Sequence, residues 1–168
     1  MMRSALIIGL ALLLSGCSYA ISPEMAGQAD KTISFEMLRA DHEAFKGRIL
    51  ILGGMIAQIN TTKQGTVIEV VQKSLDYWGK PERTNKSGGR FLVLHAGYLD
   101  ALVYAPGRSV TVAAEVEGTR QKALGEIEYS YPVLIGRELK LWEREYKGQQ
   151  PQWWDPLLYD PYGTGKPN

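Results

Sequence analysis

Reactive and metal-binding residues are scarce in this chain. Its 168 residues include one cysteine and two histidines, so no internal disulfide can form, and a zinc site, which normally takes three or four Cys, His or carboxylate ligands, is not expected. The GxSxG, GxGxxG and Walker motifs of hydrolases and nucleotide-binding proteins do not occur. We therefore predict a protein that needs no metal or cofactor and is not an enzyme.

A surplus of charge is also lacking. The chain carries 19 Lys and Arg against 18 Asp and Glu, and loss of Arg3 with the N-terminal segment described next would balance the two signs. Nucleic-acid binders need a net basic face for their phosphate contacts. We therefore expect no nucleic-acid partner.

The apolar run near the N-terminus is too short to span a membrane. It covers residues 5–14 (ALIIGLALLL), and at about 1.5 Å per residue it reaches roughly half of a hydrocarbon core. Arg3 precedes it, the small residues Ser15 and Gly16 follow it, and Cys17, the only cysteine, comes next. A charged start, an apolar run and small residues, in this order, are typical of a secretory signal.

The sequence LSGC, which ends at Cys17, resembles the lipobox of bacterial lipoproteins. The resemblance implies that residues 1–16 are a signal peptide, that the Cys17 thiol receives a diacylglyceryl group, and that the new amine is acylated. Several acyl chains hold a protein on a membrane lastingly, and no free thiol remains for catalysis. Ser18, in place of Asp, resembles proteins sorted to the outer membrane, facing the periplasm. Ordinary secretion and a plain membrane span are the alternatives.

The remaining chain is expected to hold one domain between two irregular segments. Residues 17–31 are small and polar and predict a tether, residues 32–147 the folded domain, and residues 148–168 a tail rich in Pro and aromatic residues. Ser34 is expected to cap a short helix that turns Met37, Leu38 and Phe45 inward.

Most of the domain shows strand patterns. Strands are expected over residues 48–60, 66–72, 90–95, 109–118 and 126–135, with a short sixth over 138–143. The paired glycines 53 and 54 inside the first strand indicate a bulge or bend, as at a barrel corner. The fourth strand alternates, which predicts that Val110, Val112, Ala114 and Val116 face inward and that Thr111, Ala113, Glu115 and Glu117 face solvent.

These elements predict a mainly β fold, a small antiparallel OB-like barrel of five or six strands with a short N-terminal helix. Closure of the barrel would cover the edges of so short a sheet. A two-sheet sandwich is the alternative.

Several sequence blocks resemble the Slp family of outer-membrane lipoproteins, named for a starvation-inducible member. The resemblance runs from the lipobox to Trp142 and rests on SFEMLRADHEAFKGRILILGGMIAQI (34–59), GRFLVLHAGYLD (89–100), GRSVTVAAEVEG (107–118) and YSYPVL (129–134). It implies a periplasm-facing lipoprotein linked to starvation or envelope stress, and it supplies no catalytic residues.

The function expected is therefore a non-enzymatic binding or structural module of the cell envelope. An envelope hydrolase using His95 and Asp100 is one alternative, and a carbohydrate- or small-ligand-binding protein is another.

The tail is rich in both proline and large aromatic residues, an unusual combination for a linker. It either covers an apolar face of the barrel or contacts an envelope protein, a glycan or the membrane through Trp153, Trp154, Tyr159 and Tyr162.

Overall fold

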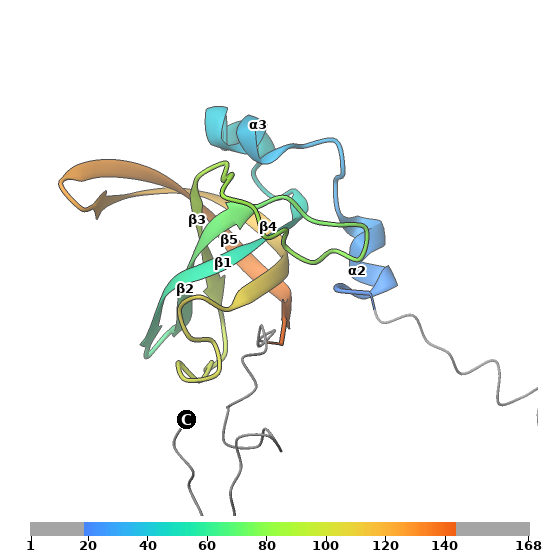
Figure 1. The fold of residues 1–168 in the computed structure, drawn as a ribbon. Coiled ribbons are helices and arrows are strands. Elements are labelled where there is room, and N and C mark those ends of the chain that lie inside the picture. The colour runs from blue at the N-terminus through green and yellow to red at the C-terminus, as the bar shows by residue number, and fades with distance from the viewer. Residues whose placement is uncertain (1–18, 144–168) are drawn as a thin grey trace, which may run out of the picture.

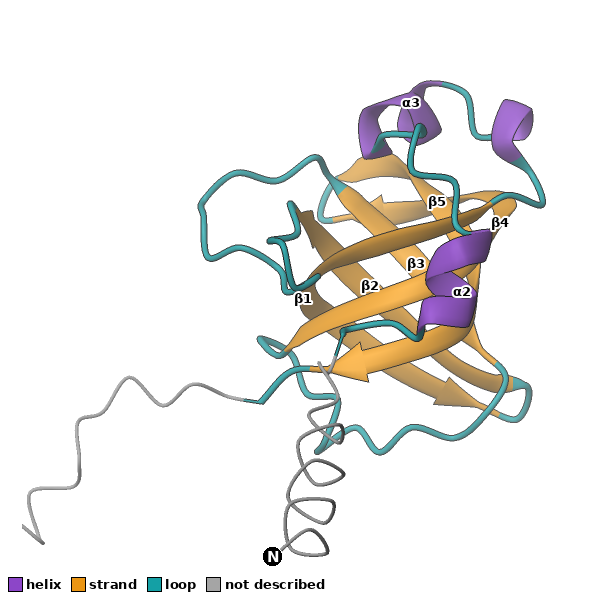
Figure 2. Ribbon diagram, turned by 90° about the vertical axis from the view of Figure 1, so that its right-hand side faces the viewer, coloured by secondary structure: helices purple, strands orange, loops and turns teal. Residues whose placement is uncertain are grey.

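Five strands follow one another along the chain and close into a barrel (Figures 1 and 2). The structure is a computed structural model and describes residues 19–143. The strands are β1 (Ile49–Thr62), β2 (Gly65–Lys73), β3 (Arg90–His95), β4 (Ser109–Leu124) and β5 (Ile127–Leu141), in the closed order β1-β2-β3-β5-β4. This order is that of an OB-like barrel, which confirms the predicted fold class.

One strand pair departs from the antiparallel arrangement expected. β3 and β5 run parallel, pairing Leu92 with Val133 and Leu94 with Ile135, whereas the other four pairs are antiparallel. Alternation within a strand fixes which residues face inward but not the direction of its neighbour, so the sequence could not distinguish the two arrangements.

The first three strands begin and end within two residues of their predicted bounds, but the last two are longer than predicted. β4 continues past Gly118 to Leu124, and the predicted sixth strand is the end of β5. The pairing of β4 with β5 shifts register between Ala113 and Ala114 and again between Val116 and Gly118. These irregularities absorb an extra residue, so the two strands stay paired beyond them. Residues 19–143 therefore contain five strands.

The glycine pair of β1 lies where this strand is shared by both of its neighbours. Gly53 pairs with Lys73 of β2 on one side and with Thr111 of β4 on the other. A Cβ on Gly54 would overlap the carbonyl oxygen of Val71. The backbones approach too closely there for a side chain on Gly54. The predicted bulge does not lie at the glycine pair, because the register shift of β1 against β2 falls between Ile56 and Gln58.

The helix α3 (Phe35–Ala40) covers one end of the barrel (Figure 2). The Ser34 hydroxyl accepts a hydrogen bond from the Met37 backbone N–H, as predicted for an N-cap. Phe35 and Leu38 are buried in the core, whereas Met37 is 46% exposed and not inward as predicted. The helix begins at Phe35, so its inward face holds residues three apart. Phe45, in the 3-10 helix η2 (Glu43–Phe45), packs against the core as expected.

The segment predicted to be a tether packs on the barrel. It contains the helix α2 (Pro23–Gln28), and Ala20 and Ile21 are buried against Ala113 of β4, with Trp142 beside them. The tether interpretation is therefore wrong from Ala20 onward. No helix among residues 19–143 has the length and apolar character to cross a membrane.

This packing also changes the environment of the outer face of β4. Val110, Val112, Ala114 and Val116 line the core as predicted. Thr111 and Ala113, expected to face solvent, are fully buried. The Thr111 hydroxyl donates to the Gly79 carbonyl at 2.6 Å and accepts from the Trp142 indole nitrogen at 2.9 Å. The alternation predicted the two faces correctly, but other segments cover part of the outer one.

Candidate functional site

A groove crosses the outer surface of the barrel between its two long hairpins. The end of β1 forms one wall, β4 forms the other, and β2 and β3 form the floor. Its volume is about 250 Å³ and it is lined by Gln58, Asn60, Thr62, Val67, Glu69, Leu92, Arg120 and Lys122. In OB-like barrels this face and these two hairpins form the usual ligand-binding surface.

Glu69 is the buried charged residue of the groove. It projects from β2, and its side chain is only 6% exposed. Its carboxylate accepts hydrogen bonds from the Arg90 guanidinium of β3 at 2.6 Å, from Lys122 Nζ of β4 at 2.8 Å and from the Tyr131 hydroxyl of β5 at 3.3 Å. One carboxylate thus links the floor of the groove to both strands of the β4–β5 hairpin, which is called the long hairpin below.

The ionisation of this cluster follows from its contacts. Burial raises the pKa of Glu69, but the hydrogen bonds and charges of Lys122 and Arg90 outweigh burial and bring the pKa below its usual value. Burial and the negative charge of Glu69 raise the pKa of Tyr131. At neutral pH Glu69 is therefore ionised, and the Tyr131 hydroxyl keeps the proton that it donates.

An apolar layer beneath the hairpin supports the charged groups. Leu92, Tyr131 and Val133 form a buried cluster outside the barrel core, with Tyr129 packed against it. The Tyr129 and Tyr131 rings meet edge to face at 4.7 Å between centroids, and the Arg90 backbone N–H donates to the Tyr129 hydroxyl. The base of the hairpin is therefore held in place next to the groove.

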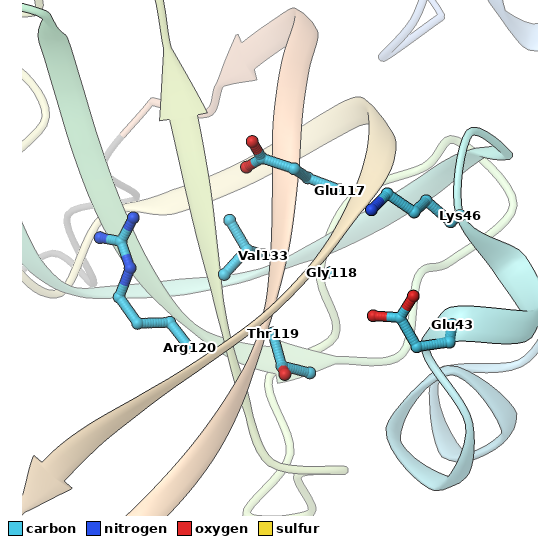
Figure 3. A pocket seen from close by; sticks show the side chains of 7 residues that line it. All are labelled: Glu43, Lys46, Glu117, Gly118, Thr119, Arg120 and Val133. Carbon is cyan, nitrogen blue, oxygen red and sulfur yellow. The ribbon is translucent and has the colours of Figure 1, made fainter.

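A second hollow adjoins the groove. Its volume is about 340 Å³, and Figure 3 shows its lining: Glu43, Lys46, Glu117, Gly118, Thr119, Arg120 and Val133. Arg120 lines both hollows, and Val133 of the second pairs directly with Leu92 of the first. The two hollows thus border one another on the outer face of β3, β4 and β5.

Arg120 differs from the other cations of the groove. Arg90 and Lys122 are both paired with Glu69, whereas the exposed side chain of Arg120 makes no hydrogen bond or ion pair with any other residue in the range 19–143. Because Arg90 and Lys122 are engaged by Glu69, Arg120 is the cation that the described lining of the groove leaves available for an anionic group.

Sequence reasoning did not find this site. Arg90 and Arg120 had the pattern of scattered, balanced surface charges, and Glu69 lay unnoticed within the second strand. One signal was present, because Glu69 is the only charged residue in the run TVIEVVQ and stands between Ile68 and Val70. A lone carboxylate in an apolar strand indicates a buried partner.

The candidate catalytic pair of the alternative hydrolase is not assembled. His95 ends β3, and its Nδ1 is buried without a hydrogen-bond partner. The Asp100 carboxylate accepts a hydrogen bond from the Leu102 backbone N–H, and among the hydrogen bonds and ion pairs of residues 19–143 none joins it to His95. Within residues 19–143, no three His, Cys, Asp or Glu side chains gather as metal ligands would. The lipidation and sorting residues Cys17 and Ser18, and the tail residues Trp153, Trp154, Tyr159 and Tyr162, lie outside the described residues.

Comparison with known proteins identifies the family. A family model described as "Outer membrane lipoprotein Slp family" matches residues 14–168. The chain belongs to this family. It is 26% identical over 168 residues to the outer membrane protein Slp of Escherichia coli strain K12, a match that covers 98% of this chain and 85% of that protein. It is also 28% identical over 92 residues to an uncharacterized protein of Haemophilus influenzae, of which it covers half. This Slp-family member is therefore an outer-membrane lipoprotein.

Two solved structures align with part of this chain. A small single-stranded DNA-binding protein from Streptomyces coelicolor aligns with a TM-score of 0.34 and 12% identity, over 55% of this chain and 92% of that one. The Plasmodium falciparum SSB in complex with ssDNA aligns with a TM-score of 0.30 and 15% identity, over 56% of this chain and 94% of that one. Neither likeness indicates what this Slp-family lipoprotein binds.

Proposed function

We propose that this lipoprotein is a non-enzymatic binding module, anchored through Cys17 on the periplasmic side of the outer membrane, that holds an acid-bearing envelope glycan in the groove. The proposal rests on which charged side chains of the groove already have a partner of opposite charge. Glu69 is neutralised by Arg90 and Lys122, while Arg120 stands unpaired within residues 19–143 at the border of two hollows. Such a cation is suited to a carboxylate on a long polar ligand.

The rest of the lining supports a glycan more than a nucleic acid. The Asn60 amide and the Gln58 amide nitrogen match sugar hydroxyls, while the Gln58 amide oxygen accepts a hydrogen bond from Lys122. Val67 and Leu92 give a small apolar floor. Sites for single-stranded nucleic acid stack bases on aromatic side chains. No aromatic residue is among the described residues that line this groove.

The groove is also better suited to binding than to hydrolysis. Glycoside hydrolysis ordinarily needs two carboxyl groups, one of them with a raised pKa so that it can act as an acid. The described lining of this groove contains a single carboxylate, Glu69, and its pKa is lowered by Lys122 and Arg90. Such a group holds neighbouring side chains in place and does not donate protons.

The binding proposal is tested with purified cell-wall glycan strands that carry carboxylates. Arg120→Gln should weaken retention about tenfold or more, because a hydrogen bond to a charged group contributes roughly 1.5–3 kcal/mol. Arg137→Gln is the matched control, because Arg137 is exposed, pairs with Glu115 and does not line the groove. Strands whose carboxyl groups have been amidated should bind both variants equally. Equal retention of native strands by both variants would contradict the proposal.

The anchor is tested at its two predicted residues. Cys17→Ala should block acylation and leave uncleaved precursor, which acyl labelling and cell fractionation detect. Ser18→Asp should divert the protein toward the inner membrane. A processed, labelled alanine variant would refute the role of Cys17, and unchanged sorting of the aspartate variant would refute that of Ser18.

A role in starvation or envelope stress is proposed on the family resemblance alone. Survival of a deletion strain in stationary phase, compared with the strain complemented by the Arg120→Gln variant, would connect that role to the groove.

A further inference from the structure

Three exposed aromatic side chains gather next to the start of the described chain. Tyr77 is 82% exposed, and Tyr19 and Trp78 are each 52% exposed. The Trp78 ring centroid lies 5.1 Å from that of Tyr77 and 6.4 Å from that of Tyr19. At about 200 Å² for each side chain, this aromatic cluster exposes roughly 370 Å², the size of a functional patch on a small protein.

The turn that carries Tyr77 and Trp78 is firmly held. The Asp76 carboxylate accepts hydrogen bonds from the backbone N–H groups of Trp78 and Lys80 at 2.9 and 2.8 Å. Gly79 has a positive φ of 80°, and its carbonyl accepts a hydrogen bond from the buried Thr111 hydroxyl. The two rings are therefore presented by a rigid support and not by a loose loop.

The same turn also packs on the N-terminal segment. A Cβ on Gly79 would lie 2.8 Å from the Ala20 side chain, so a larger residue there would push the two segments apart. Ala20 and Ile21 are themselves buried on the barrel, which fixes the position of Tyr19 relative to the turn. The aromatic cluster thus combines residues from two distant parts of the chain.

The sequence places the proposed lipid anchor directly beside this cluster. Tyr19 follows Cys17 by two residues, so their Cα atoms are at most about 7 Å apart. An acylated Cys17 must lie at the boundary between headgroups and acyl chains, so Tyr19 must lie at or near the headgroups. Trp and Tyr side chains favour this depth because their rings are apolar and their N–H or O–H groups remain hydrated.

We propose that Tyr19, Tyr77 and Trp78 insert into the headgroup region of the phospholipid leaflet and fix the orientation of the barrel on the membrane. The β4–β5 hairpin extends from the side of the barrel opposite to α2 (Figure 1), so in this orientation the groove beside the hairpin points away from the lipid. The inference rests on the proposed Cys17 anchor and adds to it a second, non-covalent contact.

A single spin label tests the contact. Acylation of Cys17 leaves an engineered cysteine as the only free thiol of the mature protein, so Tyr77→Cys can be labelled selectively with a nitroxide. Ile127→Cys, at an exposed position on the hairpin, is the matched control. The full lipidated protein is reconstituted in vesicles of phosphatidylethanolamine and phosphatidylglycerol, and collision with a water-soluble nickel complex is measured by EPR.

The nitroxide at residue 77 should collide with nickel several-fold less often than the nitroxide at residue 127, and more often with oxygen, which concentrates in lipid. Equal nickel collision at the two positions in vesicle-bound protein would overturn the membrane contact and leave the anchor intact. Protein that fails to float with the vesicles would instead refute the anchor and the contact together.

Two further variants and a truncation distinguish contact of the aromatic cluster with lipid from its burial by another part of the protein. Adding Trp78→Ser to the labelled Tyr77→Cys protein should raise nickel collision toward the control level, whereas Tyr98→Ser, which removes an exposed aromatic ring outside the cluster, should not. Truncation after Gly148 should leave the protection at residue 77 unchanged. Loss of protection on truncation would show that the C-terminal tail covers the cluster and would overturn the proposal.

Discussion

The outer surface of this barrel is built in two different ways on its two sides. On the side of α2, Thr111 and Ala113 of β4 are covered by the N-terminal segment and by Trp142, and the contacts are apolar or neutral. On the side of the long hairpin, Arg120 and Lys122 of the same strand border an open groove whose buried residue is charged. We call these the covered side and the open side.

The difference shows that one strand contributes both a packed, buried segment and a segment that borders the proposed binding groove. The covered side removes apolar surface from water and satisfies each buried polar atom of Thr111, so it adds to the stability of the barrel. The open side keeps its fixed charges near solvent, where they remain available to a ligand. Substitutions along β4 should therefore have effects that depend on the side and not only on the residue type.

The largest effect is expected from a charge on the covered side. Thr111→Asp places a carboxylate next to the Gly79 carbonyl in a fully buried position, which should lower the free energy of unfolding by about 3 kcal/mol or more. Thr119→Asp, on the exposed part of the same strand, should change it by less than about 1 kcal/mol. Urea unfolding of the detergent-solubilised protein measures both. Equal losses would mean that the two sides do not differ.

A smaller effect is expected when the buried charge of the open side loses its partners. In the double variant Arg90→Met, Lys122→Met, Glu69 remains buried and keeps the hydrogen bond from Tyr131 but loses both cationic partners, so its pKa should rise above its ordinary value. Removing the partners of a buried charge costs about 3–5 kcal/mol, and because Arg90 and Lys122 are themselves about one-third or more exposed we expect roughly 1–3 kcal/mol at pH 7.

The pH dependence of stability should change sign in that variant. In the natural protein the lowered pKa of Glu69 adds stability above about pH 4.3, the unfolded value, and this stability is lost as the pH falls through the folded pKa. In the double variant the raised pKa adds stability at low pH, which is lost as the pH rises above about 4.3. Adding Glu69→Gln should abolish the reversal. Urea unfolding measured at a series of pH values from below 4.3 up to neutral would detect this change of sign.

The smallest effect on stability is expected at Arg120. This exposed side chain has no hydrogen bond or ion pair within the described part of the chain, so Arg120→Gln should change the free energy of unfolding by less than about 0.5 kcal/mol. A larger loss would show that Arg120 supports the fold, and the groove would then lack a cation reserved for a ligand.

Local patterns in the sequence predicted most of the barrel. The alternation of β4 identified the inward residues, and Ser34 identified the start of α3. Each of these features depends on residues close together in the chain, because side-chain period and capping are set by the local backbone.

The candidate site could not be predicted in the same way. Glu69 meets Arg90 and Lys122 from two other strands, and nothing in the spacing of these residues shows that they meet. Thr111 has the pattern of an exposed residue, yet it is buried by the turn that contains Gly79 and by Trp142. The parallel pairing of β3 with β5 brings Leu92 beside Val133 and so joins the two hollows.

The sequence by itself therefore determined that the chain forms a small closed β barrel of the Slp family, with the short-range signals that start and cap its elements. Only the tertiary structure decided which parts of the outer face are covered, where the charges meet, and that Tyr19 lies beside Trp78, which in turn contacts Tyr77. The physical reason is that a strand's alternation separates its two faces, whereas the cover on a face comes from segments distant in the chain and is set by how the whole barrel packs.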